Sequence, residues 1–188
     1  MARLERIRKR MENILLDQYD AGRLSRRGLA QEMAHLNGVI VMSRHLALLR
    51  GYSSELAAVA GALHDLGRFQ LGVYGKEHAS QGAKQAVRIL KDSGDFSKSE
   101  IGIIRDAIKT HNRKGKYGHG PYNEILKDAD LLSRYFEETD QIFGANKIRR
   151  LMKLKQELYH GHTATAGEGQ PAGVLSHLQA VFQRQGGA

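Results

Sequence analysis

Residues 57–68 read AAVAGALHDLGR, an apolar run that ends in an adjacent histidine and aspartate, His64 and Asp65. The run predicts a buried helix that ends at this pair. A carboxylate at the end of a buried helix is costly unless it is paired or binds a metal ion. Adjacent side chains on a helix point about 100° apart, so both reach one ion only where the helix ends or the site lies between elements. The pair is therefore either a satisfied polar helix terminus or part of a metal site.

Helical periodicity continues on both sides of this run. Ser97 and Glu100 form a capping-box pattern ahead of one helix, and Gly51 is a natural stop for another. No stretch shows a strong strand pattern, and good helix formers dominate, so we predict an all-α fold. The expected helices cover residues 3–19, 25–50, 53–63, 77–90, 97–111 and 124–159, with a loop at Gly67, Gly72 and Gly75 and a break near Gly144.

The C-terminal part of the sequence has a different composition. Residues 161–173, GHTATAGEGQPAG, are typical of a linker. A final amphipathic stretch follows, with Val174, Leu178, Val181 and Phe182 on one face. We therefore expect a helical domain over residues 1–160, followed by a linker and a C-terminal amphipathic helix over residues 161–188. Residues 112–123 form a second glycine-rich segment, and long loops of this kind are often functional.

Composition limits the classes of protein to which the chain can belong. The 188 residues include no cysteine, which excludes disulfides and thiolate metal ligands and fits a reducing compartment. No apolar run approaches the roughly 18 residues that cross a bilayer, and the basic start lacks the apolar stretch of a secretion signal. We therefore expect a cytoplasmic protein without a membrane span. The net charge of +9 favours anionic partners such as phosphorylated metabolites or nucleic acid.

Other residues that can bind metal are spaced along the chain in apolar helical contexts. Any one of them alone is more often structural than catalytic. Several together, each flanked by core-like residues, indicate a common polar site. Besides the His64–Asp65 pair, these residues are His35, His78, His111, Asp128 and Asp130.

The ordered set H…HD…H…H…D resembles the HD superfamily of metal-dependent phosphohydrolases. Similar segments are HLNGVIVMSRHLALLRG (35–51), GALHDLGR (61–68), EHASQGA (77–83) and LKDADLL (126–132), and the resemblance covers about residues 30–135. It implies an HD-domain helical bundle, here with an N-terminal helix and a short C-terminal helical extension. Asp130 is preferred to Asp128 because the superfamily's ligand follows the alanine of an AD-x-L segment. The implied metal ligands are His35, His64, Asp65, His78, His111 and Asp130.

The resemblance to two-metal members divides these ligands between two divalent ions. Asp65 would bridge them, with His78 and His111 on the second ion. Imidazole and carboxylate ligands suit Fe, Mn, Co, Ni or Zn, with Mg less suited. Two such ions clamp a phosphoryl group and activate a water, so no protein nucleophile is needed. The expected activity is hydrolysis of a phosphoester or phosphoanhydride, in a nucleotide, with Asp65 and Arg68 at the catalytic centre.

Basic residues beside the metal histidines are the expected phosphate-binding residues. His119, in the glycine-rich loop, is a candidate proton donor or substrate contact, whereas His45 lies about 80° around its helix from His35 and should not face the metals. Segments of the chain are similar to bacterial diadenosine tetraphosphate hydrolases, except for Asn112 in place of threonine and Ser133-Arg134 in place of an acidic residue. The predicted substrate-binding residues are Arg68, Lys76, Arg113, Lys114, Lys116 and His119.

Two rival functions belong to other classes. The first is a regulatory or RNA-binding module that uses the metal site for stability, without turnover. Salt-dependent RNA binding would favour it, but a structural role does not need six ligands. The second is a di-iron oxygenase of the same fold, which oxygen uptake would identify. A phosphorylated small molecule is thus the favoured partner, ahead of nucleic acid.

Overall fold

The computed structural model describes residues 2–137 and 143–163, and within these residues every regular element is an α-helix. The predicted all-α fold is confirmed. The chain forms two compact units, Met1–Lys153 and Leu154–Ala188, and the first contains all the residues discussed below. The helices are α1 (Ala2–Asp20), α2 (Arg26–Leu49), α3 (Ser54–Leu63), α4 (Leu66–Leu71), α5 (His78–Ser93), α6 (Lys98–Thr110), α7 (Pro121–Phe136) and α8 (Ala145–Thr163).

Local sequence signals explain where several helices begin. The hydroxyls of Ser25 and Ser53 accept hydrogen bonds from backbone N–H groups in the first turns of α2 and α3. The capping box of Ser97 and Glu100 is present at the start of α6. Pro121 begins α7, where its missing N–H costs nothing. These helices therefore begin within a few residues of the predicted positions.

One predicted loop is wrong in part. Residues 66–71 form the short helix α4, although the glycines at 67, 72 and 75 predicted a loop. Gly72 adopts a left-handed conformation at φ +63° and terminates this helix, so it is a C-cap. At the other end of the chain, α8 continues to Thr163, beyond the residue where we expected the helix to stop. The rest of the predicted linker and the C-terminal amphipathic helix lie outside the described residues.

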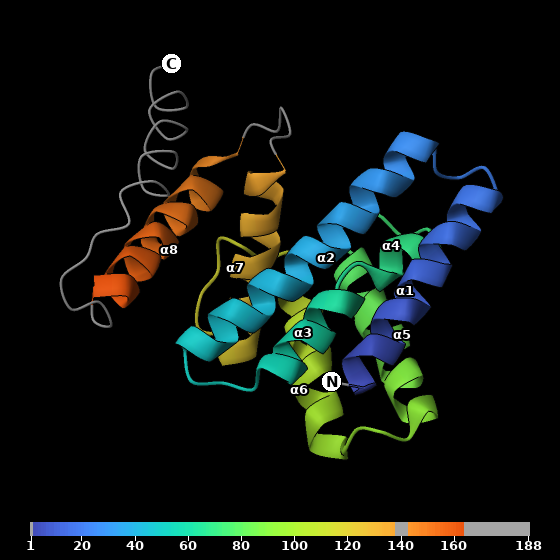
Figure 1. Ribbon diagram of the computed structural model, residues 1–188, viewed down its shortest axis with the longest axis horizontal. Coiled ribbons are helices and arrows are strands. Elements are labelled where there is room, and N and C mark those ends of the chain that lie inside the picture. The colour runs from blue at the N-terminus through green and yellow to red at the C-terminus, as the bar shows by residue number, and fades with distance from the viewer. Residues whose placement is uncertain (1, 138–142, 164–188) are drawn as a thin grey trace. The chain divides into compact units, whose positions relative to one another are not determined.

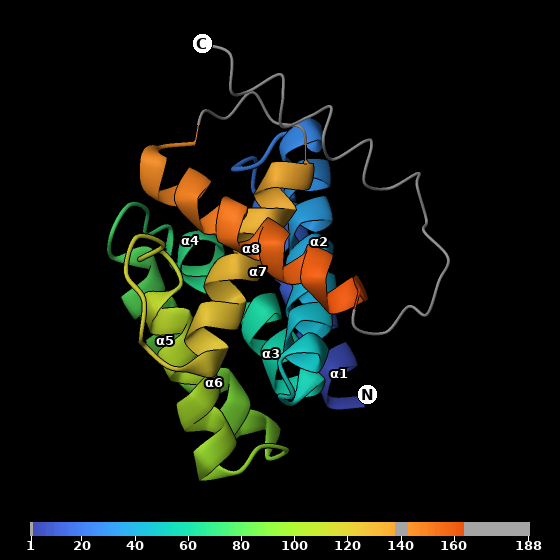
Figure 2. The same cartoon turned by 90° about the vertical axis from the view of Figure 1, so that its left-hand side faces the viewer.

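Helix α3 lies in the middle of the first unit. It contacts α1, α2, α5, α6 and α7 (Figure 1), and Leu56 to Leu63 are all buried, as the apolar run predicted. Helix α7 packs on α2, α3 and α6 (Figure 2). Because α3 has neighbours on every side, its C-terminal residues emerge among other helices and not in solvent. The His64–Asp65 pair is placed there.

Two close approaches of helices depend on glycine. A Cβ on Gly67 of α4 would lie 2.2 Å from the carbonyl oxygen of His78, and a Cβ on Gly82 of α5 would lie 2.8 Å from the amide nitrogen of Gly67. A Cβ on Gly38 of α2 would lie 2.4 Å from the hydroxyl of Ser133 on α7. These glycines let α4 approach α5, and α2 approach α7, closely enough to bring side chains from different helices into one site.

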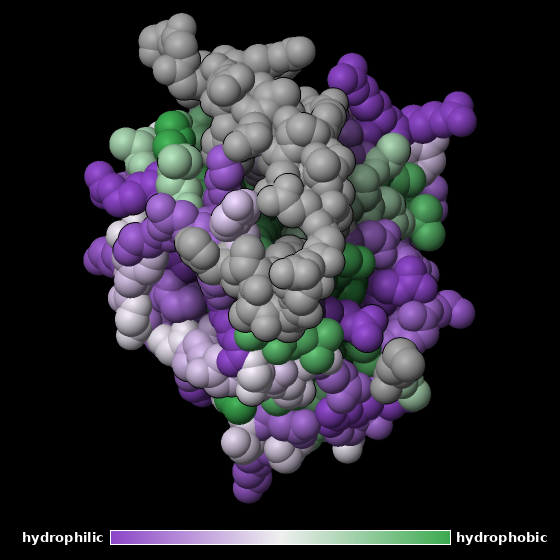
Figure 3. Space-filling model, turned by 60° about the vertical axis from the view of Figure 1, so that its left-hand side comes forward, coloured by the Kyte–Doolittle hydropathy of each residue, from purple (hydrophilic) through white to green (hydrophobic). Residues whose placement is uncertain are grey.

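The described surface is mainly polar. On the face drawn in Figure 3, hydrophilic residues cover most of the coloured surface, with smaller hydrophobic areas between them. Within the described part of the chain, no helix combines the length and the apolar composition that a membrane span requires.

We expect Gly67→Ala to destabilise the protein by about 1–3 kcal/mol, because the added methyl group overlaps the backbone of α5. Gly102→Ala is the matched control, since this helical glycine on α6 has nothing within 4 Å of its added Cβ. Its higher helix propensity should stabilise the protein by about 0.5–1 kcal/mol. Urea unfolding followed by circular dichroism measures both changes. Equal stability of the two variants would show that the approach of α4 to α5 is not tight.

Candidate metal centre

Five segments of the chain bring the six predicted metal ligands together. His35 lies on α2, His64 and Asp65 at the junction of α3 and α4, His78 at the start of α5, His111 at the end of α6, and Asp130 on α7. All are buried except His78, which is half-buried. Residues separated by almost a hundred positions in the sequence therefore form one polar cluster inside a helical protein.

Two groups within this cluster have the geometry of metal sites. In His35, His64 and Asp130, one ligand atom from each residue lies within 4.8 Å of the others. The same holds for His64, Asp65 and His111. The two groups share His64, so the adjacent pair predicted from the sequence lies at the centre of the cluster.

His78 joins the second of these groups. Its Nε2 atom lies 3.5 Å from Asp65 Oδ1 and 3.1 Å from His111 Nε2. The other carboxylate oxygen of Asp65, Oδ2, lies 3.3 Å from His64 Nε2. The Asp65 carboxylate therefore has one oxygen towards each half of the cluster, as a bridging ligand requires.

Hydrogen bonds at Nδ1 fix the orientation of the histidine rings. The Nδ1 atoms of His64, His78 and His111 donate to the backbone carbonyls of Gly61, Gly75 and Ile108, at 2.8, 2.5 and 2.8 Å. A carbonyl oxygen can only accept, so Nδ1 carries a proton, and in the neutral ring Nε2 then presents its lone pair to the cluster. Protein metal sites hold their histidine ligands in this way.

His35 is oriented by side chains instead of a carbonyl. Its Nδ1 lies 2.5 Å from the Glu137 carboxylate and 3.2 Å from the hydroxyl of Ser133, which itself donates to Glu137 at 2.8 Å. A carboxylate on the outer nitrogen raises the basicity of an imidazole ligand. The sequence analysis did not identify Glu137, because its contact with α2 depends on how α7 packs.

Two buried nitrogen atoms without hydrogen-bond partners indicate that the cluster suits a metal ion. Nε2 of His35 and Nε2 of His64 are buried and make no hydrogen bond in the described part of the protein. A buried polar atom left without a partner costs about 1–3 kcal/mol. A divalent cation between these nitrogens and Asp130 would satisfy both, and the donor set of imidazoles and carboxylates suits such an ion.

The protonation states of the two carboxylates agree with metal binding, which needs them ionised. Burial acts to raise the pKa of Asp65, but His64, His111 and Arg68 outweigh it and hold this pKa well below the usual value. Burial opposes ionisation of Asp130 as well, and Lys114 and His35 lower its pKa. Burial lowers the pKa of His111, which favours the neutral ring. Both carboxylates are therefore charged at neutral pH.

Cations balance these carboxylates. Lys114 forms a short ion pair with Asp130. Arg68 donates to Asp65 at 2.5 Å and to Glu32 at 3.1 Å. Arg134 lies 3.7 Å from Glu32, 3.9 Å from Asp65 and 3.1 Å from Glu137.

The sequence analysis did not place Glu32 or Arg134 in the site. Both could have been found by helical spacing, because Glu32 lies three residues before His35 and Arg134 four residues after Asp130.

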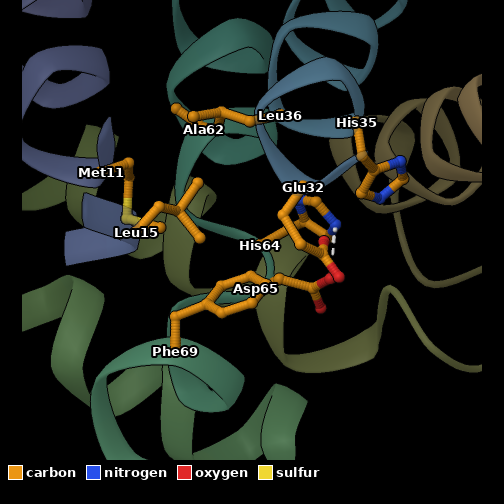
Figure 4. A pocket seen from close by; sticks show the side chains of 9 residues that line it. All are labelled: Met11, Leu15, Glu32, His35, Leu36, Ala62, His64, Asp65 and Phe69. Carbon is orange, nitrogen blue, oxygen red and sulfur yellow. Dashed lines mark ion pairs between the residues drawn. The ribbon is translucent and has the colours of Figure 1, made fainter. Parts of the chain in front are cut away.

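A small pocket adjoins the cluster (Figure 4). The acidic and imidazole side chains of Glu32, His35, His64 and Asp65 lie on one side of it. The rest of the pocket is lined by apolar side chains of α1, α2, α3 and α4, which are Met11, Leu15, Leu36, Ala62 and Phe69. Helix α1 thus closes one side of the cluster with apolar groups.

The predicted phosphate-binding residues divide into two sets. Arg68 and Lys114 contact the carboxylates of the cluster, as described above. Lys76, Arg113 and Lys116 are exposed on the two loops that flank His78 and follow His111. The amide of Asn112 donates to the carbonyl of Lys76 at 3.1 Å and so joins these loops. A role for the exposed cations in substrate binding stays a prediction.

Asp128 and His119 belong to a separate, buried network. Asp128 pairs with Arg50 at 2.7 Å and with Arg150 at 2.5 Å. Nδ1 of His119 accepts a hydrogen bond from Lys127, whose side chain is fully buried, at 2.9 Å. Asp130 therefore lies with His35 and His64, whereas Asp128 lies with the arginines, and the choice of Asp130 as the ligand stays a prediction. The proposed substrate contact of His119 stays a prediction, and His45 is exposed on α2.

Comparisons with known proteins agree with this architecture. A family model described as HD domain matches residues 33–135, which is more than half of the chain. A crystal structure of a predicted HD superfamily hydrolase from an uncultured Thermotogales bacterium is similar, with a TM-score of 0.50 and 20% sequence identity. The similarity covers 84% of this chain and 92% of that one, and at this identity it indicates a shared fold. No curated protein sequence matches the chain.

We expect Asp130→Asn to weaken metal binding by at least about 100-fold, because replacing even an outer partner of a ligand costs about 10- to 100-fold. Asp128→Asn is the matched control on the same helix. It should leave metal content unchanged and destabilise the protein by about 3 kcal/mol, because Arg50 and Arg150 lose a buried counter-charge. Metal analysis of purified protein and urea unfolding measure the two effects. Loss of metal in Asp128→Asn alone would mean that the ligand was assigned to the wrong aspartate.

Proposed function

The chain belongs to the HD domain family, and on that basis we propose that it is a metal-dependent phosphohydrolase. The substrate is a nucleotide, and the reaction cleaves a phosphoester or phosphoanhydride bond with a metal-activated water. The observation that carries the proposal is the convergence of imidazole Nε2 atoms and ionised carboxylates in one buried cluster. Their outer hydrogen bonds hold the ligand atoms towards a common centre.

The proposal gives each ligand a role. His35, His64 and Asp130 would hold one divalent ion, and His78 and His111 the other, with Asp65 between them. Bound ions of this kind polarise a phosphoryl group and lower the pKa of a water molecule between them. The Nδ1 hydrogen bonds orient the imidazoles with Nε2 towards the centre of the cluster, so the ligand geometry is formed before a substrate arrives.

Arg68 is the residue best placed to bind the phosphoryl group. Its guanidinium is half-buried at the edge of the cluster, and it contacts Asp65 and Glu32. Burial acts to lower the pKa of Arg68, but Asp65 and Glu32 raise it, so the group stays charged. A planar guanidinium binds phosphate oxygens through paired hydrogen bonds. Arg68 would thus orient the substrate and stabilise negative charge that develops on it.

Removal of metal tests the proposal. Treatment with a chelator should abolish phosphate release from a panel of nucleotides, and added Mn²⁺ or Fe²⁺ should restore it. His64→Ala should stay inactive after the same addition, because an ion ligand is missing. His45→Ala is the control, since this exposed histidine lies outside the cluster, and its rate should stay within a few-fold of the wild type. Undiminished phosphate release by the metal-free protein would refute the proposal.

The number of ions can be tested separately. Replacement of both His78 and His111 by alanine should halve the bound metal, because His35, His64 and Asp130 remain to hold one ion. In crystals of metal-replete wild-type protein, anomalous density should show two peaks with Asp65 between them. A single peak, with the rings of His78 and His111 turned away from it, would reduce the site to one ion.

A further inference from the structure

Lys147, the third residue of α8, is a half-buried cation for which the described residues provide no ion-pair partner. Within residues 2–137 and 143–163 its ammonium makes no hydrogen bond or ion pair with a carboxylate. Its nearest described aromatic contact is Phe143, whose ring centre lies 5.4 Å from Nζ. The pKa of Lys147 is lowered by burial and by the positive charges of Lys114 and Arg134, against the opposing effect of Asp130.

Contacts on both sides of Lys147 fix its place in the first unit. The side chain of Asn146 packs on Gly115, where an added Cβ would lie 3.0 Å from the amide nitrogen. Arg150 donates to the carbonyl of Lys114 at 3.2 Å. Arg150 is itself anchored to Asp128. The turn of α8 that carries Lys147 therefore lies against the loop that carries Lys114, beside the metal cluster.

Lys114 and Arg134 are the two cations whose positive charges lower the pKa of Lys147. Both are paired with carboxylates in the structure: Lys114 with Asp130, and Arg134 with Asp65 and Glu137. Divalent ions on Asp65 and Asp130 would take over these two carboxylates. Lys114 would then have lost its counter-charge, and Arg134 would have lost one of its carboxylate partners. Lys147 has no ion-pair partner among the described residues. Like charges gathered at partly buried positions repel one another unless an anion lies between them.

We propose that Lys147, together with Lys114 and Arg134, forms a phosphate subsite beside Asp130. The inference rests on the proposed function, because it places this subsite next to the metal ions. Arg68 lies at the Asp65 side of the cluster, so the subsite on α7 and α8 would hold a phosphate group other than the one that is attacked. The substrates that fit carry at least two linked phosphate groups. Lys114 and Arg134 lie within the residues matched by the family model, whereas Lys147 on α8 lies outside them, so α8 supplies the one cation of the subsite that the matched region does not contain.

Binding of two phosphonates by the metal-loaded full chain tests the subsite. Methylenediphosphonate carries two linked phosphoryl groups and methylphosphonate carries one, and neither is hydrolysed. Calorimetry should show that Lys147→Gln weakens methylenediphosphonate binding about tenfold, the worth of one charge-assisted hydrogen bond. Methylphosphonate binding should change less than about twofold, because this ligand can bind at the metals and Arg68 alone.

Three controls make the result specific. Lys147→Arg should restore diphosphonate binding, and Lys153→Gln, an exposed lysine on the same helix, should bind both probes like the wild type. Metal content and melting temperature of each variant, measured after titration, show that the ions and the fold are retained. Equal diphosphonate affinity in wild type and Lys147→Gln, or an equal loss for both probes, would overturn the subsite. Lys147-dependent binding without hydrolysis of any nucleotide would instead refute the proposed function and leave the subsite standing.

Discussion

Two carboxylates, Asp65 and Asp130, lie buried among the helices, and an ionised carboxylate in such surroundings must be balanced by positive charge. Much of the site follows from this requirement. Arg68, Lys114 and Arg134 supply the balance in the structure, and four imidazoles surround the same two groups. The cluster can exist only because α3 ends inside the protein, where neighbouring helices provide the partners.

Close contacts between helices also help to assemble the cluster. Glycines allow α4 to approach α5 and α2 to approach α7, and these are the approaches that bring His78 towards Asp65 and Ser133 towards His35. At the outer side of the cluster, backbone carbonyls one turn before His64, His78 and His111 hold the rings. The ligand positions are therefore fixed mainly by the backbone, while the charge balance is fixed by side chains from several helices.

The sequence predicted the parts of this structure that depend on local order. The apolar run before His64 and the capping box at Ser97 correctly predicted α3 and α6. Helix α4 was missed because Gly72, which terminates it, was taken as part of a loop. The contact of Glu137 with His35 could not be predicted, since it depends on how the end of α7 packs on α2. Likewise, nothing in the sequence separates the fully buried Lys127, the partner of His119, from an exposed lysine.

The ion pair of Lys114 with Asp130 has a consequence for ion selection. An incoming cation has to displace an ammonium group that already neutralises the carboxylate. When a monovalent ion replaces the ammonium group, the net charge of the site does not change, and the ion gives up its hydration shell as well. A divalent ion gains one net charge and also the lone pairs of His35 and His64, which sodium and potassium bind poorly. Lys114 would therefore compete with alkali cations for Asp130 and favour ions of higher charge.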